Sequence, residues 1–211
     1  MMNLIYKEVK LSISLLFFIL PFLLGLLMFL PNWIFTFVFM YFFWISAPQI
    51  YSAYIAQQDF SFSMMLPISK KEYVKSKIYA LYIIECLHLF FGFLFGIIHN
   101  LIYGQSNLFF DVNIAFFGMI LVLFTVFNIL FLPLYFRSGY FFGKPVIYGI
   151  AATMIFGFII EWSAIKYQWF RDIFEGPLLT QVIVAVVSIV ITIIANVIAL
   201  KKSVTNYESS L

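Results

Sequence analysis

Glu85 and His88 are the residues of this sequence most able to do chemistry. They stand in a long apolar run, where Gly92, Gly96 and His99 continue the series at intervals of three or four residues. At about 100° per residue, these positions share one side of a helix. A carboxyl group beside an imidazole can relay a proton or line a substrate path. The pair can instead form a structural hydrogen bond that positions neighbouring helices, and the sequence leaves both interpretations open.

Small and amide residues nearby favour an interior position for this stripe. Gly92 and Gly96 have the spacing that lets another helix backbone approach closely within a membrane. In a second apolar run, the side-chain amide of Asn128 can hydrogen-bond to a neighbouring helix. The pattern therefore predicts that Glu85, His88, Gly92, Gly96 and Asn128 face protein, either at a substrate path or at a helix interface.

Other catalytic and metal-binding patterns do not occur in the sequence. One glutamate with one nearby histidine supplies too few ligands for a metal ion, and Cys86 is the single cysteine. The segment Gly139-Tyr-Phe-Phe-Gly-Lys144 superficially resembles a phosphate-binding loop. Its glycines are too close together, however, and Pro145 replaces the required Ser or Thr. We therefore predict no catalytic residue, no metal site and no nucleotide hydrolysis by this chain.

The composition indicates the class of protein. Of 211 residues, 64% are hydrophobic and 10% are charged, whereas soluble proteins average roughly 45–50% apolar and about 25% charged residues. So few charges cannot cover a soluble fold, which predicts an integral membrane protein. Runs such as 15–30 and 116–132 are apolar on every side, which favours helices over a β-barrel. We attribute most of the 22% aromatic content to lipid-facing positions and to belts at the membrane surfaces.

We expect an all-α integral membrane protein with a single transmembrane domain over residues 1–211. A span needs about 20 apolar residues, and six runs qualify. They lie at about 11–30, 33–55, 78–101, 113–136, 146–165 and 179–200.

Two further segments are predicted to lie at the membrane surface. Met1–Ser14 is amphipathic and indicates an interfacial N-terminal helix. Before the last span, the segment Glu161–Leu178 carries large apolar residues at helical spacing and stops at Gly176-Pro177. It predicts an interfacial or re-entrant helix, with a loop anchored by its aromatic residues as the alternative. The residues at helical spacing are Trp162, Ile165, Trp169 and Ile173.

The basic residues predict the orientation in the membrane. Ten of the 12 lie before the first span, after the last, or in the loops that follow the second and fourth spans. Only Lys166 and Arg171 lie on the other side. Because basic residues in short loops stay in the cytoplasm, both termini are predicted to be cytoplasmic.

The loop of residues 57–77, which we call the inner knob, is the most informative stretch. Ser69 and Glu72 have the spacing of a capping box, which starts a helix. These features predict a compact, partly helical knob on the cytoplasmic side. A polybasic loop that fixes topology and touches anionic lipid is the alternative. The short apolar stripe before the box comprises Phe60, Met64, Met65 and Leu66.

The inner knob resembles the corresponding loop of ABC-2-type permeases, the membrane subunits of bacterial ABC exporters. These carry an acidic residue and an apolar patch, then Leu-Pro-(Ile/Val)-Ser-(Arg/Lys)-x-Glu-x-Val-x-x-Lys leading into the third span. Here Leu66-Pro-Ile-Ser-Lys-Lys-Glu72 is followed by Tyr-Val-Lys-Ser-Lys77, so that the glutamate comes after two lysines. The expected layout of an amphipathic N-terminal helix, six spans and a membrane-dipping segment is similar as well.

The resemblance implies a multi-pass subunit of an exporter in the bacterial plasma membrane. The knob would dock on separate cytoplasmic ABC ATPase subunits, which would hold ATP and Mg, whereas this chain would bind no cofactor. Membrane lipid and a second permease chain, identical or a sister, are the other implied partners, and nucleic acid is not one. The residues implied in ATPase coupling are Asp59, Met65, Leu66, Pro67, Ser69, Lys70, Lys71 and Glu72.

The resemblance implies outward transport, and the aromatic, nearly charge-free helices favour an amphipathic or apolar cargo. A membrane-active peptide, a lipid or an antibiotic fits this description, and the resemblance implies peptide export or antimicrobial resistance as the expected role. One alternative is a non-transport scaffold, sensor or immunity protein that binds partners through Gly92 and Gly96. Another is an intramembrane enzyme that uses Glu85 and His88.

Overall fold

The computed structural model describes residues 1–104, 107–138 and 141–209, and the side chains of all of these except Leu11, Ser12, Phe60 and Met64. Every regular element in this part of the chain is a helix, as predicted. Here η1 and η3 are π-helical and η2 is a 3₁₀ turn. The helices are α1 (Met2–Lys7), η1 (Glu8–Ser12), α2 (Leu16–Gly25), η2 (Leu26–Phe29), α3 (Thr36–Tyr41), η3 (Phe42–Ser46), α4 (Ala47–Ala56), α5 (Asp59–Met64), α6 (Lys70–Tyr103), α7 (Ile114–Arg137), α8 (Gly143–Lys166), α9 (Gln168–Phe174) and α10 (Leu178–Ser209).

Four helices in the described residues, α6, α7, α8 and α10, are long and apolar enough to cross a membrane. α7 and α8 lie within a few residues of the predicted spans. α6 starts at Lys70 rather than at 78, because the Ser69 cap begins the helix before the apolar run does. α10 continues to Ser209, well past the predicted end at 200.

The first two predicted spans consist of shorter pieces. Residues 16–29 form one apolar helix from α2 and η2, which is shorter than the about 20 residues of a typical span. The predicted start at 11 is wrong, because Ile13 is extended (φ −97°, ψ 118°) and separates η1 from α2. Residues 36–56 are helical without a gap through α3, η3 and α4. The π turn η3 lies next to Pro48, whose missing N–H cannot make the regular helical bond.

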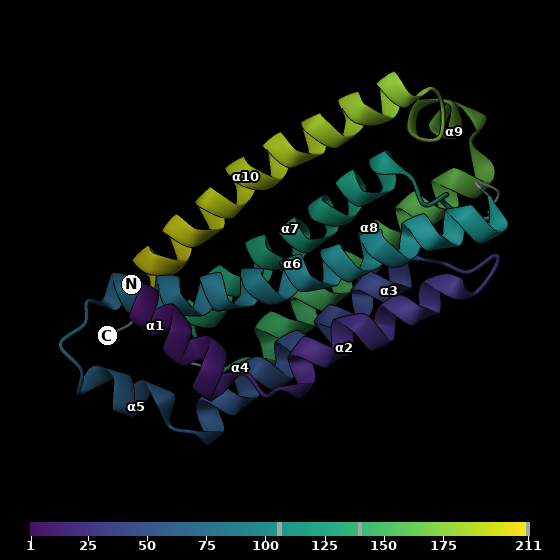
Figure 1. Cartoon of the computed structure of the whole chain (residues 1–211). Coiled ribbons are helices and arrows are strands. Elements are labelled where there is room, and N and C mark those ends of the chain that lie inside the picture. The colour runs from purple at the N-terminus through teal and green to yellow at the C-terminus, as the bar shows by residue number, and fades with distance from the viewer. Residues whose placement is uncertain (105–106, 139–140, 210–211) are drawn as a thin grey trace.

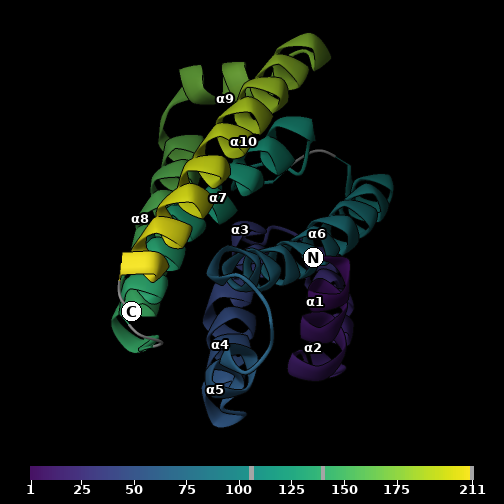
Figure 2. The same cartoon turned by 90° about the vertical axis from the view of Figure 1, so that its left-hand side faces the viewer.

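The long helices lie side by side along the long axis of the molecule. α9 stands at one end, and α5 and both termini stand at the other (Figure 1). In the perpendicular view, α7, α8 and α10 form one group, while α1 and α2 lie on the opposite side, next to α6 (Figure 2). Both termini thus share one end, and the side of the membrane on which this end lies stays a prediction.

Aromatic rings fill the interior between α7 and the path of α3, η3 and α4. Phe43 and Phe127 stack with their centroids 4.5 Å apart, and Tyr51 meets Phe131 edge-on at 4.7 Å. All four residues are 0% exposed. Part of the aromatic content therefore lies in the protein interior, whereas the attribution of most of it to lipid and belts stays a prediction. Between helices in lipid, association depends on close packing, to which ring contacts contribute.

The glycines of α6 receive side chains rather than a helix backbone. The ring of Phe39 lies against Gly92 and the side chain of Val112 lies against Gly96. Within the part of this chain that the structure describes, no other helix backbone packs closely against Gly92 and Gly96, so that expectation is wrong for contacts inside the chain. A close backbone approach occurs instead at Gly118 of α7, where a Cβ would lie 2.9 Å from Ala185 Cα of α10.

The segment before the last span is helical, as predicted, but it is divided in two. α8 continues to Lys166, Tyr167 is extended (φ −114°, ψ 110°), and α9 follows. The break changes the direction of the chain, so one continuous interfacial helix is excluded. The four large residues of the predicted stripe are 41–58% exposed, and their position in the membrane stays a prediction.

Candidate functional site

Four charged side chains meet at the end of the molecule that holds α5 and the termini. Lys7 Nζ lies 2.6 Å from Asp59 Oδ1 and 3.2 Å from Glu8 Oε1. Lys77 Nζ lies 2.6 Å from Asp59 Oδ2 and 3.3 Å from Glu8 Oε2. We call these four residues the inner ion cluster. It joins segments that are far apart in the sequence, namely α1 with η1, α5 and α6.

The inner ion cluster is almost fully enclosed. The side chains of Lys77, Glu8 and Asp59 are 0%, 1% and 4% exposed. Tyr73 donates its hydroxyl to Asp59 Oδ2 at 3.1 Å, and Lys77 Nζ lies 3.2 Å from the centroid of the Tyr54 ring. Buried charges of this kind are tolerated only when they are paired and hydrogen-bonded. The cluster therefore holds the N-terminal helix and α5, the first helix of the inner knob, against α6.

The charges of the cluster shift one another's protonation. Burial alone raises the pKa of Asp59, but Lys77 and Lys7 outweigh burial and hold this pKa below its usual value. Burial alone lowers the pKa of Lys7, but its hydrogen bond to Asp59 and the charge of Glu8 raise this pKa above its usual value. The folded state thus favours the ionised forms of Asp59 and Lys7.

The capping box predicted in the inner knob is confirmed. Ser69 Oγ accepts from the backbone N–H of Glu72 at 3.2 Å, and the Glu72 carboxylate accepts from the backbone N–H of Ser69 at 3.2 Å. This reciprocal pair starts α6 within the knob.

The outward surface of the inner knob is apolar and basic. Met65 is 81% exposed and Phe62 is 54% exposed, and Pro67 and Lys71 are exposed beside them. Unlike the other residues predicted for ATPase coupling, Asp59 is buried, and its carboxylate points inward to the ion cluster. The predicted apolar stripe includes Phe60 and Met64, whose side chains lie outside the described residues. Ser69 is exposed, and the partly exposed positions are Leu66, Lys70 and Glu72.

A second polar group lies in the middle of the helices and joins α6, α7 and α10. Asn128 Nδ2 donates to Glu85 Oε2 and to Asn196 Oδ1, each at 3.2 Å. Asn196 Nδ2 donates to Thr125 Oγ1 at 3.1 Å, and the hydroxyl of Tyr82 donates to Asn196 Oδ1 at 3.0 Å. We call these five residues the membrane polar network. Glu85 and Asn128, both predicted to face protein, are brought together here.

His88 and the stripe glycines are buried on the same side of α6, as the pattern predicts. The predicted hydrogen bond between Glu85 and His88 is not formed in the described residues. Instead, His88 Nδ1 meets the carbonyl of Ile84 at 3.0 Å, and its ring packs edge-on against Phe42. The backbone carbonyl one helical turn back lies within reach of the imidazole and satisfies one ring nitrogen, so this nitrogen does not bond to the carboxyl group.

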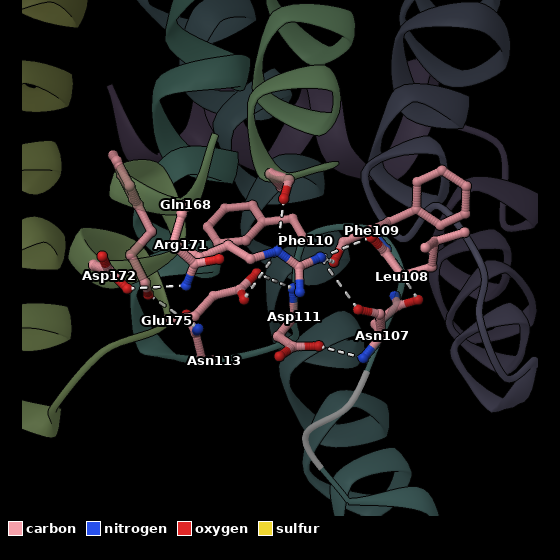
Figure 3. Close-up of polar contacts among 12 residues, drawn as sticks. Asn107, Leu108, Phe109, Phe110, Asp111, Asn113, Gln168, Arg171, Asp172 and Glu175 are labelled. Carbon is pink, nitrogen blue, oxygen red and sulfur yellow. Dashed lines mark hydrogen bonds and ion pairs between the residues drawn. The ribbon is translucent and has the colours of Figure 1, made fainter. Parts of the chain in front are cut away.

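The opposite end of the molecule is held by Arg171 of α9 (Figure 3). Its Nη2 donates to the carbonyl of Leu108 at 2.7 Å, and its Nε donates to the carbonyl of Ala164 at 2.6 Å. Glu175 lies 3.8 Å from Arg171 Nε and accepts from the backbone N–H of Asp111 at 3.1 Å. Burial raises the pKa of both Asp111 and Glu175. These contacts fix α9 to the loop between α6 and α7.

Three of the described pockets are lined mainly by apolar residues, whereas another includes Arg137 and Lys144. One of about 160 Å³ lies between α3 and α8, and Glu161 is at its wall. The Glu161 carboxylate accepts from the hydroxyl of Thr36 and from the backbone N–H of Phe110. A volume near 150 Å³ can hold a group the size of benzene. Within the described residues, no three His, Cys, Asp or Glu side chains are placed to hold a metal, and part of the segment Gly139–Lys144 lies outside them.

The comparison with known families decides the class of this chain. Residues 3–208 match the family described as ABC-2 family transporter protein. The chain belongs to this family. Membership makes it a membrane permease of an ABC transporter, a component that normally lacks its own ATPase and associates with ABC ATPase partners. No curated protein and no solved structure matches the chain significantly.

Sequence reasoning missed most partners in the two inner networks. Nothing in the sequence marks Lys7, Glu8 or Lys77 as buried, because a sequence does not distinguish a buried charge from a solvated one near a span end. Asn196 carried a usable signal. Ser188, Thr192 and Asn196 recur every four residues in the otherwise apolar α10, which marks one side of that helix as facing protein.

Proposed function

We propose that this ABC-2 permease is the membrane subunit of an exporter in a bacterial plasma membrane, and that its inner knob is the contact for the ATPase. The main support is that the knob exposes Phe62, Met65 and Pro67 next to Lys71. A buried ion cluster also fastens α5 of the knob to α6. An exposed apolar group on a rigid support fits a docking site. Both termini share this end of the molecule, so we place all of them in the cytoplasm.

The ion cluster connects the knob mechanically to the membrane-spanning part of α6. α6 continues from Ser69 through Lys77 to Glu85 without a break, so a displacement of the knob is passed to the membrane polar network. In this proposal Asp59 does not touch the ATPase. It holds the knob, while Met65, Leu66, Pro67, Lys70 and Lys71 make the contact. ATP and Mg are bound by the partner, whose closure on ATP moves the knob.

We propose six crossings, with residues 16–29 and 36–56 as the first two. The second segment is long enough to cross, and the first is short for a core of ~30 Å. Local thinning of the bilayer can accommodate a short helix at modest cost. Asn32 adopts positive φ (53°) in the turn between the two, which allows a tight reversal.

The proposed cargo is amphipathic or apolar and moves outward, as a membrane-active peptide, a lipid or an antibiotic would. The apolar lining of three of the described pockets supports this cargo class. We also propose that two permease chains enclose the path. Over much of its length α10 exposes aliphatic side chains that lipid or a second chain would cover.

The first test asks whether the knob binds an ATPase. Each ABC ATPase subunit of the source genome is co-expressed and co-purified with the permease, and ATP hydrolysis is measured with and without it. Met65→Asp places a charge in the proposed apolar contact, so we expect at least a tenfold loss of co-purification with the cognate subunit. Leu108→Asp is the matched control, because Leu108 is 62% exposed and contacts Arg171 of α9 at the opposite end.

Equal co-purification of the Met65→Asp variant and the Leu108→Asp control would refute the knob as the contact. If no ATPase subunit binds the wild-type chain or changes its hydrolysis rate, the scaffold or sensor function replaces the exporter.

A further inference from the structure

Two buried oxygens of the membrane polar network have no hydrogen-bond donor among the described residues. Asn128 uses both hydrogens of its amide nitrogen, toward Glu85 Oε2 and Asn196 Oδ1. Its own oxygen Oδ1 has no donor, and neither has Glu85 Oε1, although both atoms are buried. Two planar groups that already share one hydrogen bond therefore each hold an acceptor oxygen without a donor. Buried polar atoms in this state demand a partner.

No positive charge compensates Glu85. The residue is 7% exposed, Asn128 is fully buried, and no lysine or arginine in the described residues forms an ion pair with Glu85. An ionised carboxylate in such surroundings is strongly disfavoured. α7 and α10 face it with neutral amides and the hydroxyl of Thr125. The titratable groups around it are Tyr82, Cys86 and His88 of α6 and Tyr51 of α4.

We propose that Glu85 and Asn128 form an intramembrane proton-binding site. Glu85 carries the proton on Oε1 and donates it to Asn128 Oδ1, while Asn128 Nδ2 donates to Oε2. A carboxylic acid and an amide thereby form a ring of two hydrogen bonds. One added proton gives both unpartnered oxygens a hydrogen bond and removes the charge of the carboxylate. Rotation of the two side chains without an added proton leaves the charge in place.

The site links proton release to separation of the helices. Because Asn128 also holds Asn196, the ring connects α6 to α7 and α10. When the helices part and water reaches Glu85, the carboxylic acid can ionise and give its proton to water, and closure takes the proton up again. Over the pH range between the open and closed pKa values, the opening equilibrium shifts about tenfold per pH unit toward the open form as pH rises. This inference goes beyond the proposed function, because it requires no ATPase.

Infrared spectroscopy of the purified chain in lipid vesicles tests the proton directly. At neutral pH we expect the carbonyl band of a protonated carboxylic acid, which shifts in D₂O, and we expect Glu85→Gln to remove that band. Glutamine imitates the neutral acid, so the variant should fold. Glu72→Gln is the control, since this carboxylate lies in the capping box at the membrane surface and its loss should leave the band in place.

A second variant tests the ring. In Asn128→Leu the acid loses its acceptor, so the band should stay but move to higher frequency. A spectrum that is unchanged in this region by Glu85→Gln would overturn the proton-binding site. A band at the same frequency in Asn128→Leu would overturn the ring. The Asn128→Leu measurement also decides the case if Glu85→Gln fails to fold.

Discussion

Lys77 shows how one side chain can connect three segments of the chain. It is the buried cation between Glu8 and Asp59, and it lies over the ring of Tyr54. Lys77→Met keeps the apolar body of the side chain but leaves two buried carboxylates with one cation fewer. Breaking a buried pair in this way costs about 3–5 kcal/mol. We expect that loss in the free energy of unfolding, measured by denaturation in mixed micelles.

Lys75 provides the matched comparison, because it is a partly exposed lysine of the same helix. Lys75→Met should change the free energy of unfolding by no more than about 0.5 kcal/mol. Equal losses for the two variants would show that the ion cluster does not hold the segments together.

Protonation of Asp59 makes the same cluster sensitive to acid. Its pKa is lower in the folded state than its usual value of 3.8, because Lys77 and Lys7 outweigh burial. The stability it contributes is therefore complete above pH 3.8 and is lost as pH falls through the folded pKa. We expect the unfolding temperature of the wild type to fall below this pH. In Asp59→Asn the unfolding temperature should fall less between neutral and acid pH, because the variant has no carboxylate at this position to protonate. Asp172→Asn, at an exposed position of α9, should keep the wild-type acid loss.

At the scale of elements, the start of α6 depends on a cap rather than on hydropathy. Ser69→Ala removes the side-chain acceptor for Glu72 N–H, which typically costs about 1 kcal/mol. The first turn of α6 carries Tyr73, which donates to Asp59, so fraying should also loosen α5. We expect faster hydrogen exchange in both α5 and the first turn of α6. Ser61→Ala, at an exposed position of α5, is the control, and the same exchange in both variants would contradict the coupling.

The elements that follow from local chemistry were predictable, and those that depend on partners were not. The cap at Ser69, the interior stripe on α6 and the bounds of α7 and α8 follow from periodicity, spacing and hydropathy. The early end of η1 was not predictable, because hydropathy continues across Ile13 where the backbone turns. The partners of Gly92, Lys77 and Glu85 come from other helices, so no pattern within their own segments reveals them.

At the scale of the whole molecule, the length of α6 argues for an asymmetric placement across the membrane. Its 34 residues extend about 51 Å at 1.5 Å per residue, whereas the hydrocarbon core is ~30 Å thick. The apolar part of the helix comes after Lys77, so the excess length lies at the end that carries Lys70, Lys71 and Lys75 beside the inner knob. Basic residues at that end favour the cytoplasm.

This placement is tested by labelling single cysteines from either side. In a Cys86→Ser background, Met65→Cys reports the inner knob and Leu108→Cys reports the opposite end, and both positions are well exposed. We expect a membrane-impermeant maleimide to label only the Leu108→Cys variant in intact cells and only the Met65→Cys variant in inverted vesicles. The reverse pattern would place the inner knob outside the cell, where no ATP-driven partner could reach it, and would exclude the proposed coupling.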